Sequence, residues 1–239
     1  MSLLRLMRKK NYYLFIFLIV FSAIKVFSQK PKFNLSKLNS TNDISQHTIL
    51  SIHKDKFGFI WFGTQDGLNR YDGFKFDVFK YSDNNKQSLP SNYIQTISED
   101  KDGNLWIGTR THGISKFRRS DRAFINYRHD SKVKESLSSN KINQVLVDKN
   151  GNLWVATNKG LNLLDSKTER FQHFFHNSSD NSSLSSSNVI SIYKDSGNNL
   201  WVGTDNGLNL LNSDTGKWTR FYDKRPGHQN NNFINRVMD

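Results

Sequence analysis

The segment from Asp100 to Asn104 is the first place in this chain where residue types and spacing could perform chemistry. It reads Asp-Lys-Asp-Gly-Asn, so that alternate side chains carry the oxygen atoms that calcium prefers. An EF-hand loop needs glycine at position six and glutamate at position twelve, whereas glycine stands here at position four and Thr111 at position twelve. The matching segment Asp-Lys-Phe-Gly, which begins at Asp55, lacks the second oxygen. The pattern therefore favours a structural hairpin turn over a metal site.

Other patterns of this kind are weaker. Gly108 to Gly113 resembles a phosphate-binding loop, but Ile114 stands where that loop requires lysine. The one close histidine pair, His173 and His176, is predicted to point to opposite faces of a strand. No serine or acid lies in a nucleophile-elbow or paired-carboxylate context, and the absence of cysteine excludes thiolate chemistry. We predict no catalytic residue, no metal site and no cofactor, and hence no enzyme.

Composition and charge indicate an ordinary soluble chain. It has 239 residues, of which 36% are hydrophobic and 23% charged, which excludes collagenous, coiled-coil and multi-span membrane proteins. The net charge of +13 is partly concentrated before residue 29, where five cations and no acid occur. The remaining charges are scattered without blocks of like sign, so a solvated basic surface is favoured over a nucleic-acid interface.

Residues 1–28 are typical of an export signal. The basic segment MSLLRLMRKK precedes an apolar run from Tyr12 to Ile24, which Lys25 ends. A run of 13 residues is shorter than the roughly 20 that cross a bilayer, and it matches the core of a signal peptide. Ser28, with Val26 two residues before it, offers a cleavage point; an uncleaved N-terminal anchor is the alternative. Either one predicts a periplasmic, extracytoplasmic location for the rest of the chain.

One sequence unit is written four times in the rest of the chain. Each unit carries a tryptophan, and the four are separated by 45, 48 and 47 residues: Trp61, Trp106, Trp154 and Trp201. Apolar residues recur six and three positions before each turn aspartate, as Ile94 and Ile97 do before Asp100. Spacers of the type Ser-Leu-x-Ser-Asn join the units at 88–92, 136–140 and, more loosely, 183–188. Periods of about 40–50 residues are typical of propellers and solenoids.

The content of each period predicts four short strands and no helix. In the clearest units these are Ile94 to Ser98, Leu105 to Thr109, Leu161 to Leu164 and Phe171 to Phe175. The fold class is therefore all-β, a β-propeller of four-stranded antiparallel blades. The four in-register tryptophans are predicted to form the blade core, whereas Trp218 lies outside the register and stays open between surface stacking and core packing.

The repeat also predicts the domain boundaries. An N-terminal segment at 29–44 carries a ring-closing strand at about 33–38. The repeats fill 45–239, with blades at about 45–90, 91–138, 139–185 and 186–232 and a fifth unit that starts at 233. Ile234 and Val237 would be its first apolar pair. We therefore expect a truncated, unclosed propeller with an open edge.

Strand alternation predicts where a ligand could bind. The turns from second to third strand and the connections between blades emerge on the same face, and these turns vary while their surroundings stay constant. The candidate residues are Gln65, Asp66, Arg110, His112, Asn158, Lys159, Asp205 and Asn206. Arg110 and His112 stand out because their turn is one residue longer and both donate hydrogen bonds to sugar hydroxyls or carboxylates. Neutral variation of solvated turns explains the same pattern equally well.

The opening unit, SQHTILSIHKDKFGFIWFGTQDGLNRYDGFKF, resembles the first blade of two-component regulator propeller proteins, and the resemblance covers about residues 33 to 239. It implies the extracytoplasmic sensor region of a hybrid two-component system that recognises oligosaccharides. In that family, further sensor repeats, a transmembrane helix to the inner membrane and a histidine kinase follow, and the whole protein is dimeric. None of those parts is found in this sequence, so no kinase activity is carried over. A non-sensory scaffold for protein–protein interaction is the main alternative, and a propeller lyase or glycosidase the third.

Overall fold

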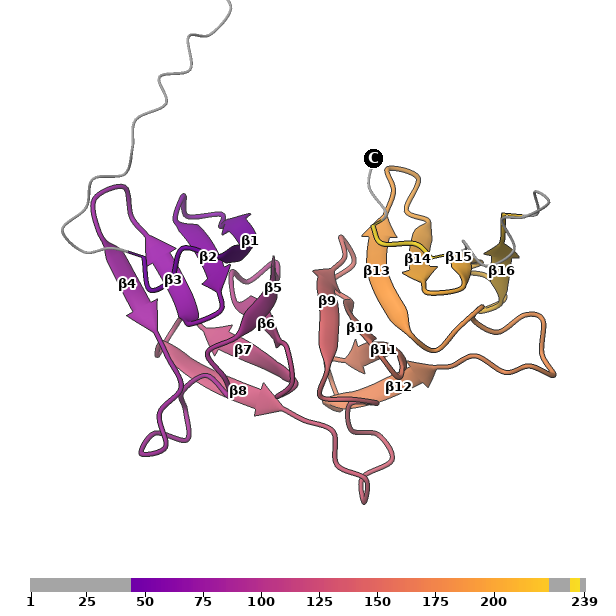
Figure 1. The fold of residues 1–239 in the computed structure, drawn as a ribbon, viewed down its shortest axis with the longest axis horizontal. Helices are drawn as coiled ribbons and strands as arrows, with labels where there is room; N and C mark the ends of the chain where they lie inside the picture. The colour runs from indigo at the N-terminus through magenta and orange to yellow at the C-terminus, as the bar shows by residue number, and fades with distance from the viewer. Residues whose placement is uncertain (1–43, 224–232, 237–239) are drawn as a thin grey trace, which may run out of the picture. The chain divides into compact units, whose positions relative to one another are not determined.

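The described part of the chain consists of β-strands and their connections. The computed structural model describes residues 44–223 and 233–236; the predicted export signal and the predicted ring-closing strand lie outside these residues. Sixteen strands form four separate antiparallel sheets of four strands each within the described part (Figure 1). This confirms the propeller fold.

Each sheet uses its four strands in chain order, so that every blade is a simple meander. Blade 1 contains β1 (Ile49–Lys54), β2 (Ile60–Thr64), β3 (Gly67–Tyr71) and β4 (Phe76–Phe79); blade 2 contains β5 (Ile94–Glu99), β6 (Leu105–Thr109), β7 (Ile114–Arg118) and β8 (Ala123–Tyr127). Blade 3 contains β9 (Ile142–Val147), β10 (Leu153–Thr157), β11 (Gly160–Asp165) and β12 (Arg170–Phe174); blade 4 contains β13 (Val189–Lys194), β14 (Leu200–Thr204), β15 (Gly207–Leu211) and β16 (Trp218–Phe221). The second strand of blade 2 has the predicted bounds, and the predicted fourth strand of blade 3 lies one residue earlier.

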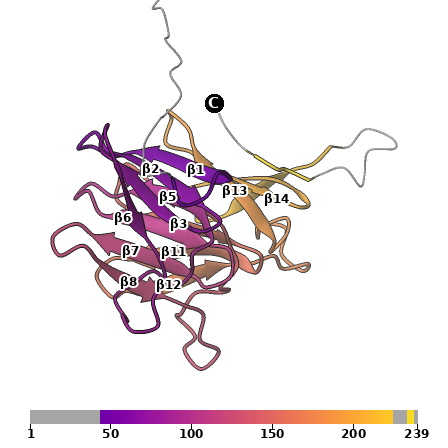
Figure 2. The same cartoon turned by 60° about the vertical axis from the view of Figure 1, so that its left-hand side comes forward.

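The first strands of consecutive blades pack against one another. Figure 2 shows β1 beside β5, and β5 in turn contacts β9 while β9 contacts β13. In blades 1 and 2 the second strand carries a glycine where the next blade approaches: a Cβ added at Gly63 would lie 2.7 Å from Ile94 Cγ2, and one at Gly108 would lie 2.7 Å from Ile142 Cγ2. Because a large side chain would collide with the next blade, this position takes a small residue, which in blade 3 is the fully buried Ala156.

The hydrophobic core lies between neighbouring blades. One cluster joins Trp61 of blade 1 to Phe117 of blade 2, whose rings have centroids 5.4 Å apart. The spacer leucines Leu89, Leu137 and Leu184 are fully buried in these clusters. Burying such side chains stabilises the fold by about 1.5–3 kcal/mol each. The apolar residue of each spacer is therefore part of the core, and the polar residues around it form the connection.

The connections also cover the outer edges of the blades. The backbone N–H of Phe124 in β8 donates to Gln87 O at 3.0 Å, and that of Phe171 in β12 donates to Glu135 O at 2.8 Å. Trp218 N in β16 donates to Ser182 O at 2.9 Å in the same way. Each connection thus pairs with the fourth strand of the blade that follows it, and occupies hydrogen-bonding groups of an edge strand.

The structure also bears on the predictions for Trp218 and for the fifth unit. Trp218 lies in β16 with 5% of its surface exposed and its ring against Phe174, so it packs in the core rather than on the surface. Ile234 N donates to Thr204 O at 2.9 Å, and Ile234 packs on Gly203 as Ile94 packs on Gly63. Ile234 therefore takes the place of the first residue of a next first strand, and a fifth unit starting at 233 stays a prediction.

Candidate functional site

The turns between second and third strands lie against the connections that join the blades. Their backbone groups are paired at 2.6–3.2 Å: Gly67 N with Asn92 O, Gly113 N with Asn140 O, Gly160 N with Ser187 O, and Asp205 N with Asn188 O. Turns and connections therefore share one face of the propeller, as strand alternation predicted. We call this the turn face.

A buried polar network holds the connection to the blade. In blade 3, Ser138 N donates to Asn162 Oδ1 at 2.8 Å, and Asn162 Nδ2 donates back to Ser138 Oγ at 2.9 Å. Thr157 Oγ1 lies 3.0 Å from Ser138 Oγ and donates to Gly160 O at 2.8 Å, which closes the turn. Asn162 and Thr157 are fully buried, so each of these bonds replaces water that the groups have lost.

The same network recurs in blades 1 and 4. It is formed by Ser45, Asn69 and Thr64 in blade 1 and by Ser185, Asn209 and Thr204 in blade 4. Sequence reasoning did not find it. Its signal was present as an asparagine inside an otherwise apolar third strand, 24 residues after a connection serine. The network makes the backbone of the turn face a fixed frame.

Blade 2 departs from this network. Its connection carries Pro90 where the others have serine, and proline has no N–H to donate. The third strand carries Ser115 in place of asparagine, and Ser115 Oγ donates to Asn126 Oδ1 at 2.6 Å. Asn126 Nδ2 then donates to Ser88 O at 3.0 Å. The lost donor and the lost acceptor compensate each other, and the connection is held from β8 instead.

A cavity of about 400 Å³ opens on the turn face at this departure. It is lined by residues of the connection between blades 1 and 2, by the longer turn of blade 2 and by the residue that follows β8: Tyr81, Pro90, Ser91, Asn92, His112 and Arg128. His112 comes from the predicted site. Tyr81, Pro90 and Arg128 are lining residues that sequence reasoning missed, because they lie far from His112 in the chain.

Arg110 is held away from this cavity. Its guanidinium lies 5.0 Å from the centre of the Tyr93 ring and donates to Tyr93 Oη at 2.9 Å. Thr111 Oγ1 lies 3.0 Å from His112 Nδ1, so the hydroxyl orients the imidazole. Arg110 and His112, neighbours in sequence, thus face different surroundings.

The other predicted residues lie on the turn faces of their own blades. Asp66 accepts from Lys80 Nζ at 2.6 Å and from Asn92 Nδ2 at 3.2 Å. Asn158 Oδ1 accepts from Ser139 at 2.7 Å, and Asp205 accepts from Asn188 at 2.9 Å. These three side chains link turns to connections, whereas Gln65, Lys159 and Asn206 are exposed at their turns. Their role in binding stays a prediction.

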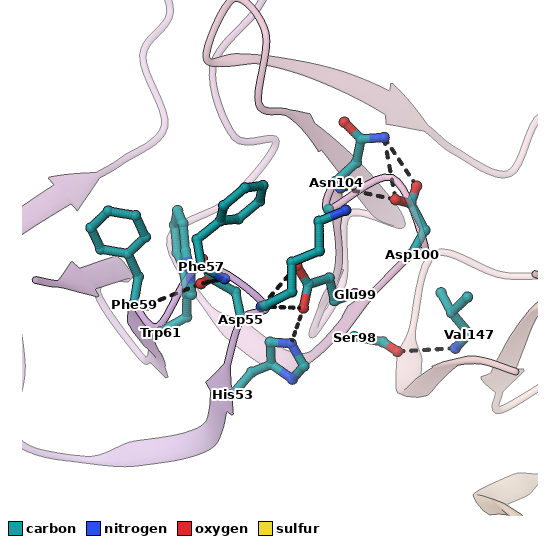
Figure 3. A network of polar contacts seen from close by, with 12 residues as sticks. His53, Asp55, Phe57, Phe59, Trp61, Ser98, Glu99, Asp100, Asn104 and Val147 are labelled. Atoms are coloured by element: carbon teal, nitrogen blue, oxygen red, sulfur yellow. Dashed lines mark hydrogen bonds and ion pairs between the residues drawn. The ribbon is translucent and has the colours of Figure 1, made fainter. Parts of the chain in front are cut away.

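The opposite face carries the aspartate turns, where the side chains act as structural acceptors (Figure 3). Asp55 accepts from the backbone N–H of Phe57 and Phe59 and from Trp61 Nε1, the last at 2.7 Å. Arg119 of blade 2 donates to the same carboxylate at 2.6 Å. Burial opposes ionisation, but the hydrogen bonds from Trp61 and Arg119 outweigh it and hold the pKa of Asp55 below its ordinary value.

The turn that begins at Asp100 has the same geometry with a weaker set of donors. Asp100 Oδ1 accepts from Asn104 N at 2.9 Å (Figure 3). It also accepts from Asp102 N at 3.0 Å. Among the described residues, Asp100 accepts no hydrogen bond from Trp106, and no group of histidines and acids is placed to hold a metal ion. His173 Nε2 donates to Ser136 O and His176 Nδ1 donates to Leu184 O, each at 2.7 Å, so both histidines bind connections.

A second cavity, of about 930 Å³, lies among the first strands. It is lined by residues of β1, β5, β9 and β13 and by Asn235 and Arg236. Gln144 Oε1 accepts from Ile192 N at 2.8 Å across it, whereas Ser51 Oγ and Ser191 Oγ are buried without a partner among the described residues. No helix in residues 44–223 and 233–236 has the length and apolar character that a membrane span requires.

Comparison with known proteins identifies the repeat. The family model described as two component regulator propeller matches residues 43–66, 88–111, 136–159 and 183–206. Histidine kinase P4 of Formosa agariphila is 34% identical over 74 residues, which are 31% of this chain and 5% of that protein. The chain thus spans a small part of the curated relative that it matches.

Solved structures agree with this at the level of the fold. An extracellular domain described as that of a hybrid two-component system from B. thetaiotaomicron is 26% identical with a TM-score of 0.60, and the alignment covers 78% of this chain and 32% of that one. Virginiamycin B lyase from Staphylococcus aureus, 14% identical with a TM-score of 0.54 over 82% of this chain and 60% of that one, shares the fold alone. Four repeats matched in register, on the blades described above, show that the chain belongs to the two-component regulator propeller family.

Proposed function

We propose that this chain is an extracytoplasmic sensor module of a two-component system and that its turn face recognises oligosaccharides. One observation carries the proposal: a buried Ser–Asn–Thr network fixes the backbone of the turns, while the exposed side chains on them differ from blade to blade. A rigid frame with variable side chains is the arrangement that binding surfaces use.

Exposed aromatic residues on the turn face support a sugar ligand. Phe175 is 48% exposed and its ring covers Gly160, and Tyr222 is 37% exposed and its ring covers Gly207. Aromatic faces beside polar turn residues supply the apolar and hydrogen-bonding contacts that small polar ligands need. A sugar offers both, because its rings have apolar faces and hydroxyl edges.

The proposal extends to the whole protein. The apolar segment at 12–24 would direct export to the periplasm, and sensor and kinase parts outside this sequence would carry the signal across the inner membrane in a dimer. The similarity to the extracellular domain of a hybrid system supports this location. Fractionation of the native cells and sequencing of the mature N-terminus test it: a cytoplasmic protein that retains Met1 would contradict the proposal.

Calorimetry tests the sugar ligand. The 239-residue protein would be titrated with a panel of neutral and acidic oligosaccharides, and one or more should bind. Replacing both Arg110 and His112 by alanine should weaken that binding roughly tenfold or more, since a charge-assisted hydrogen bond contributes about 1.5–3 kcal/mol. Absence of binding to every oligosaccharide would overturn the proposal and favour the alternative of a protein-binding scaffold.

A further inference from the structure

The 400 Å³ cavity on the turn face is where this chain departs most from its own repeat. Pro90 stands where the other connections carry Ser45, Ser138 and Ser185. Tyr81 stands where His129 and His176 occur, and both histidines bind the spacer backbone, at Leu137 O and Leu184 O. The turn of blade 2 is one residue longer than the others and places His112 at the cavity. Three departures from a repeated pattern thus line one cavity.

The departures leave the frame intact. Loss of the N–H at Pro90 is matched by Ser115, which replaces the asparagine that would accept from it, and Asn126 holds the connection instead. Thr109 Oγ1 still donates to Gly113 O at 2.8 Å, so the longer turn closes as the shorter ones do. Because the blade keeps its hydrogen bonds, the changes alter the surface and not the fold.

Two side chains of the cavity wall, Arg128 and His112, carry nitrogen atoms that have no hydrogen-bond partner among the described residues. Arg128 forms no ion pair or side-chain hydrogen bond with another described residue, and its guanidinium carries five N–H groups in one plane. His112 uses Nδ1 toward Thr111, which leaves Nε2. The acceptors are already occupied: Asn92 Oδ1 accepts from Tyr81 N at 2.7 Å.

No acid in the described part of the chain lines the cavity. Asp66 pairs with Lys80 at 2.6 Å, and Asp83, which accepts from the hydroxyl of Tyr81, lies outside the lining. The wall therefore offers a guanidinium and an imidazole nitrogen and no carboxylate. Such a site matches an anionic oxygen group, which accepts two hydrogen bonds from an arginine side by side.

The geometry points to a subsite for an acidic sugar residue in this cavity, in which Arg128 and His112 bind its carboxylate or sulfate and Tyr81 and Pro90 contact its ring. This rests on the proposed function and names the class of ligand. A volume of about 400 Å³ lies within the range of small-ligand pockets, and is enough for one sugar residue with its acidic group. The rest of an oligosaccharide would extend over the turn face.

The test compares matched sugars. The 239-residue protein would be titrated by calorimetry with galacturonate and guluronate–mannuronate oligosaccharides and with sulfated galactose oligosaccharides. Methyl-esterified galacturonate and unsulfated galactose oligosaccharides are the neutral counterparts of two of them. We expect one acidic sugar to bind at least tenfold more tightly than its neutral counterpart. The carboxylate and sulfate arms identify which acidic group is recognised.

Two variants separate the cavity from general electrostatics. Arg128→Gln should weaken binding of the acidic sugar tenfold or more. Lys141→Gln removes the same charge from the next connection on the turn face, where Lys141 is exposed and does not line the cavity, and should change affinity less than twofold. Far-ultraviolet circular dichroism would establish that both variants fold.

Each result decides the proposal. Equal losses in the two variants, or equal affinity for acidic and neutral sugars, would overturn the subsite. Binding of neutral sugars alone would overturn the subsite and leave the proposed function standing. Absence of binding to every sugar would overturn both.

Discussion

Replacing Asp55 by asparagine is the sharpest test of how the blades are joined. One carboxylate oxygen, Oδ1, accepts from two backbone N–H groups, and the other, Oδ2, accepts from Trp61 Nε1 at 2.7 Å and from Arg119 of blade 2 at 2.6 Å. Asparagine keeps the first oxygen and replaces the second by an NH₂ group. The two donors would then face a third donor, and Arg119 would lose its counter-charge.

The expected cost follows from the burial of this site. The side chain of Asp55 is completely buried and that of Arg119 is 21% exposed. Breaking a buried ion pair by removing one partner costs about 3–5 kcal/mol. The corresponding change at Asp100 is milder, since the side chain is 13% exposed and its Oδ2 accepts only from Asn104 Nδ2, at 3.1 Å, with Lys116 Nζ 3.8 Å away. We expect about 0.5–1.5 kcal/mol for Asp100→Asn.

Native-state hydrogen exchange measures both changes locally, which suits a repeat protein whose blades need not unfold together. The amides of β2 should exchange roughly a hundredfold to a thousandfold faster, or more, in Asp55→Asn, because each 1.4 kcal/mol is a factor of ten. Those of β6 should change by no more than about tenfold in Asp100→Asn. Equal effects of the two substitutions would refute the assignment of Asp55 as a buried link between blades.

Three further predictions concern the fold. Trp106→Ala should lower the free energy of unfolding by about 3–5 kcal/mol in urea denaturation, because it empties a core position that is 5% exposed. Gly113→Ala should be far more costly in the same assay than Gly58→Ala: both have positive φ, but a Cβ at Gly113 meets Tyr127 O and one at Gly58 meets nothing. Burial opposes ionisation of Asp148, but the hydrogen bond from Lys194 and the other hydrogen bonds to the carboxylate lower its pKa. Ionised Asp148 therefore stabilises the folded state above pH about 3.9, and this stabilisation is lost as the pH falls through the lowered pKa. Urea midpoints from pH 2 to 7 should fall less steeply with acid in Asp148→Asn.

Much of the fold could be predicted because the repeat displays its core directly. The tryptophan, the glycine or alanine two residues later and the apolar pair before each aspartate recur at fixed spacing, and Trp61, Trp106 and Trp154 are buried in the core of their blades. Trp218 could not be assigned in this way because its position in the fourth strand carries phenylalanine, not tryptophan, in the other units: Phe76, Phe124 and Phe171. Its burial depends on Phe174 of the preceding blade, which only the packed structure brings close.

The candidate site could be predicted as a face and not as a set of residues. Strand alternation identifies the end of the blade at which the turns emerge, and the structure has them there. Which side chain enters the cavity depends on neighbours distant in sequence. Arg110 is held by Tyr93, which lies 17 residues away in the sequence. Arg128 reaches the cavity because β8 ends beside Gly113.

The exchange at Pro90 and Ser115 explains how one blade can change its surface at little cost to its frame. If blade 2 had Pro90 but kept asparagine at position 115, the buried side-chain oxygen of that asparagine would lack a donor. An unsatisfied buried acceptor of this kind costs about 1–3 kcal/mol. A serine alone would leave a connection N–H without its acceptor. Together they remove both halves of one hydrogen bond, and Asn126 supplies a new one to Ser88 O. Since paired removal of donor and acceptor is nearly neutral, the side chains above the pair are free to specify a ligand.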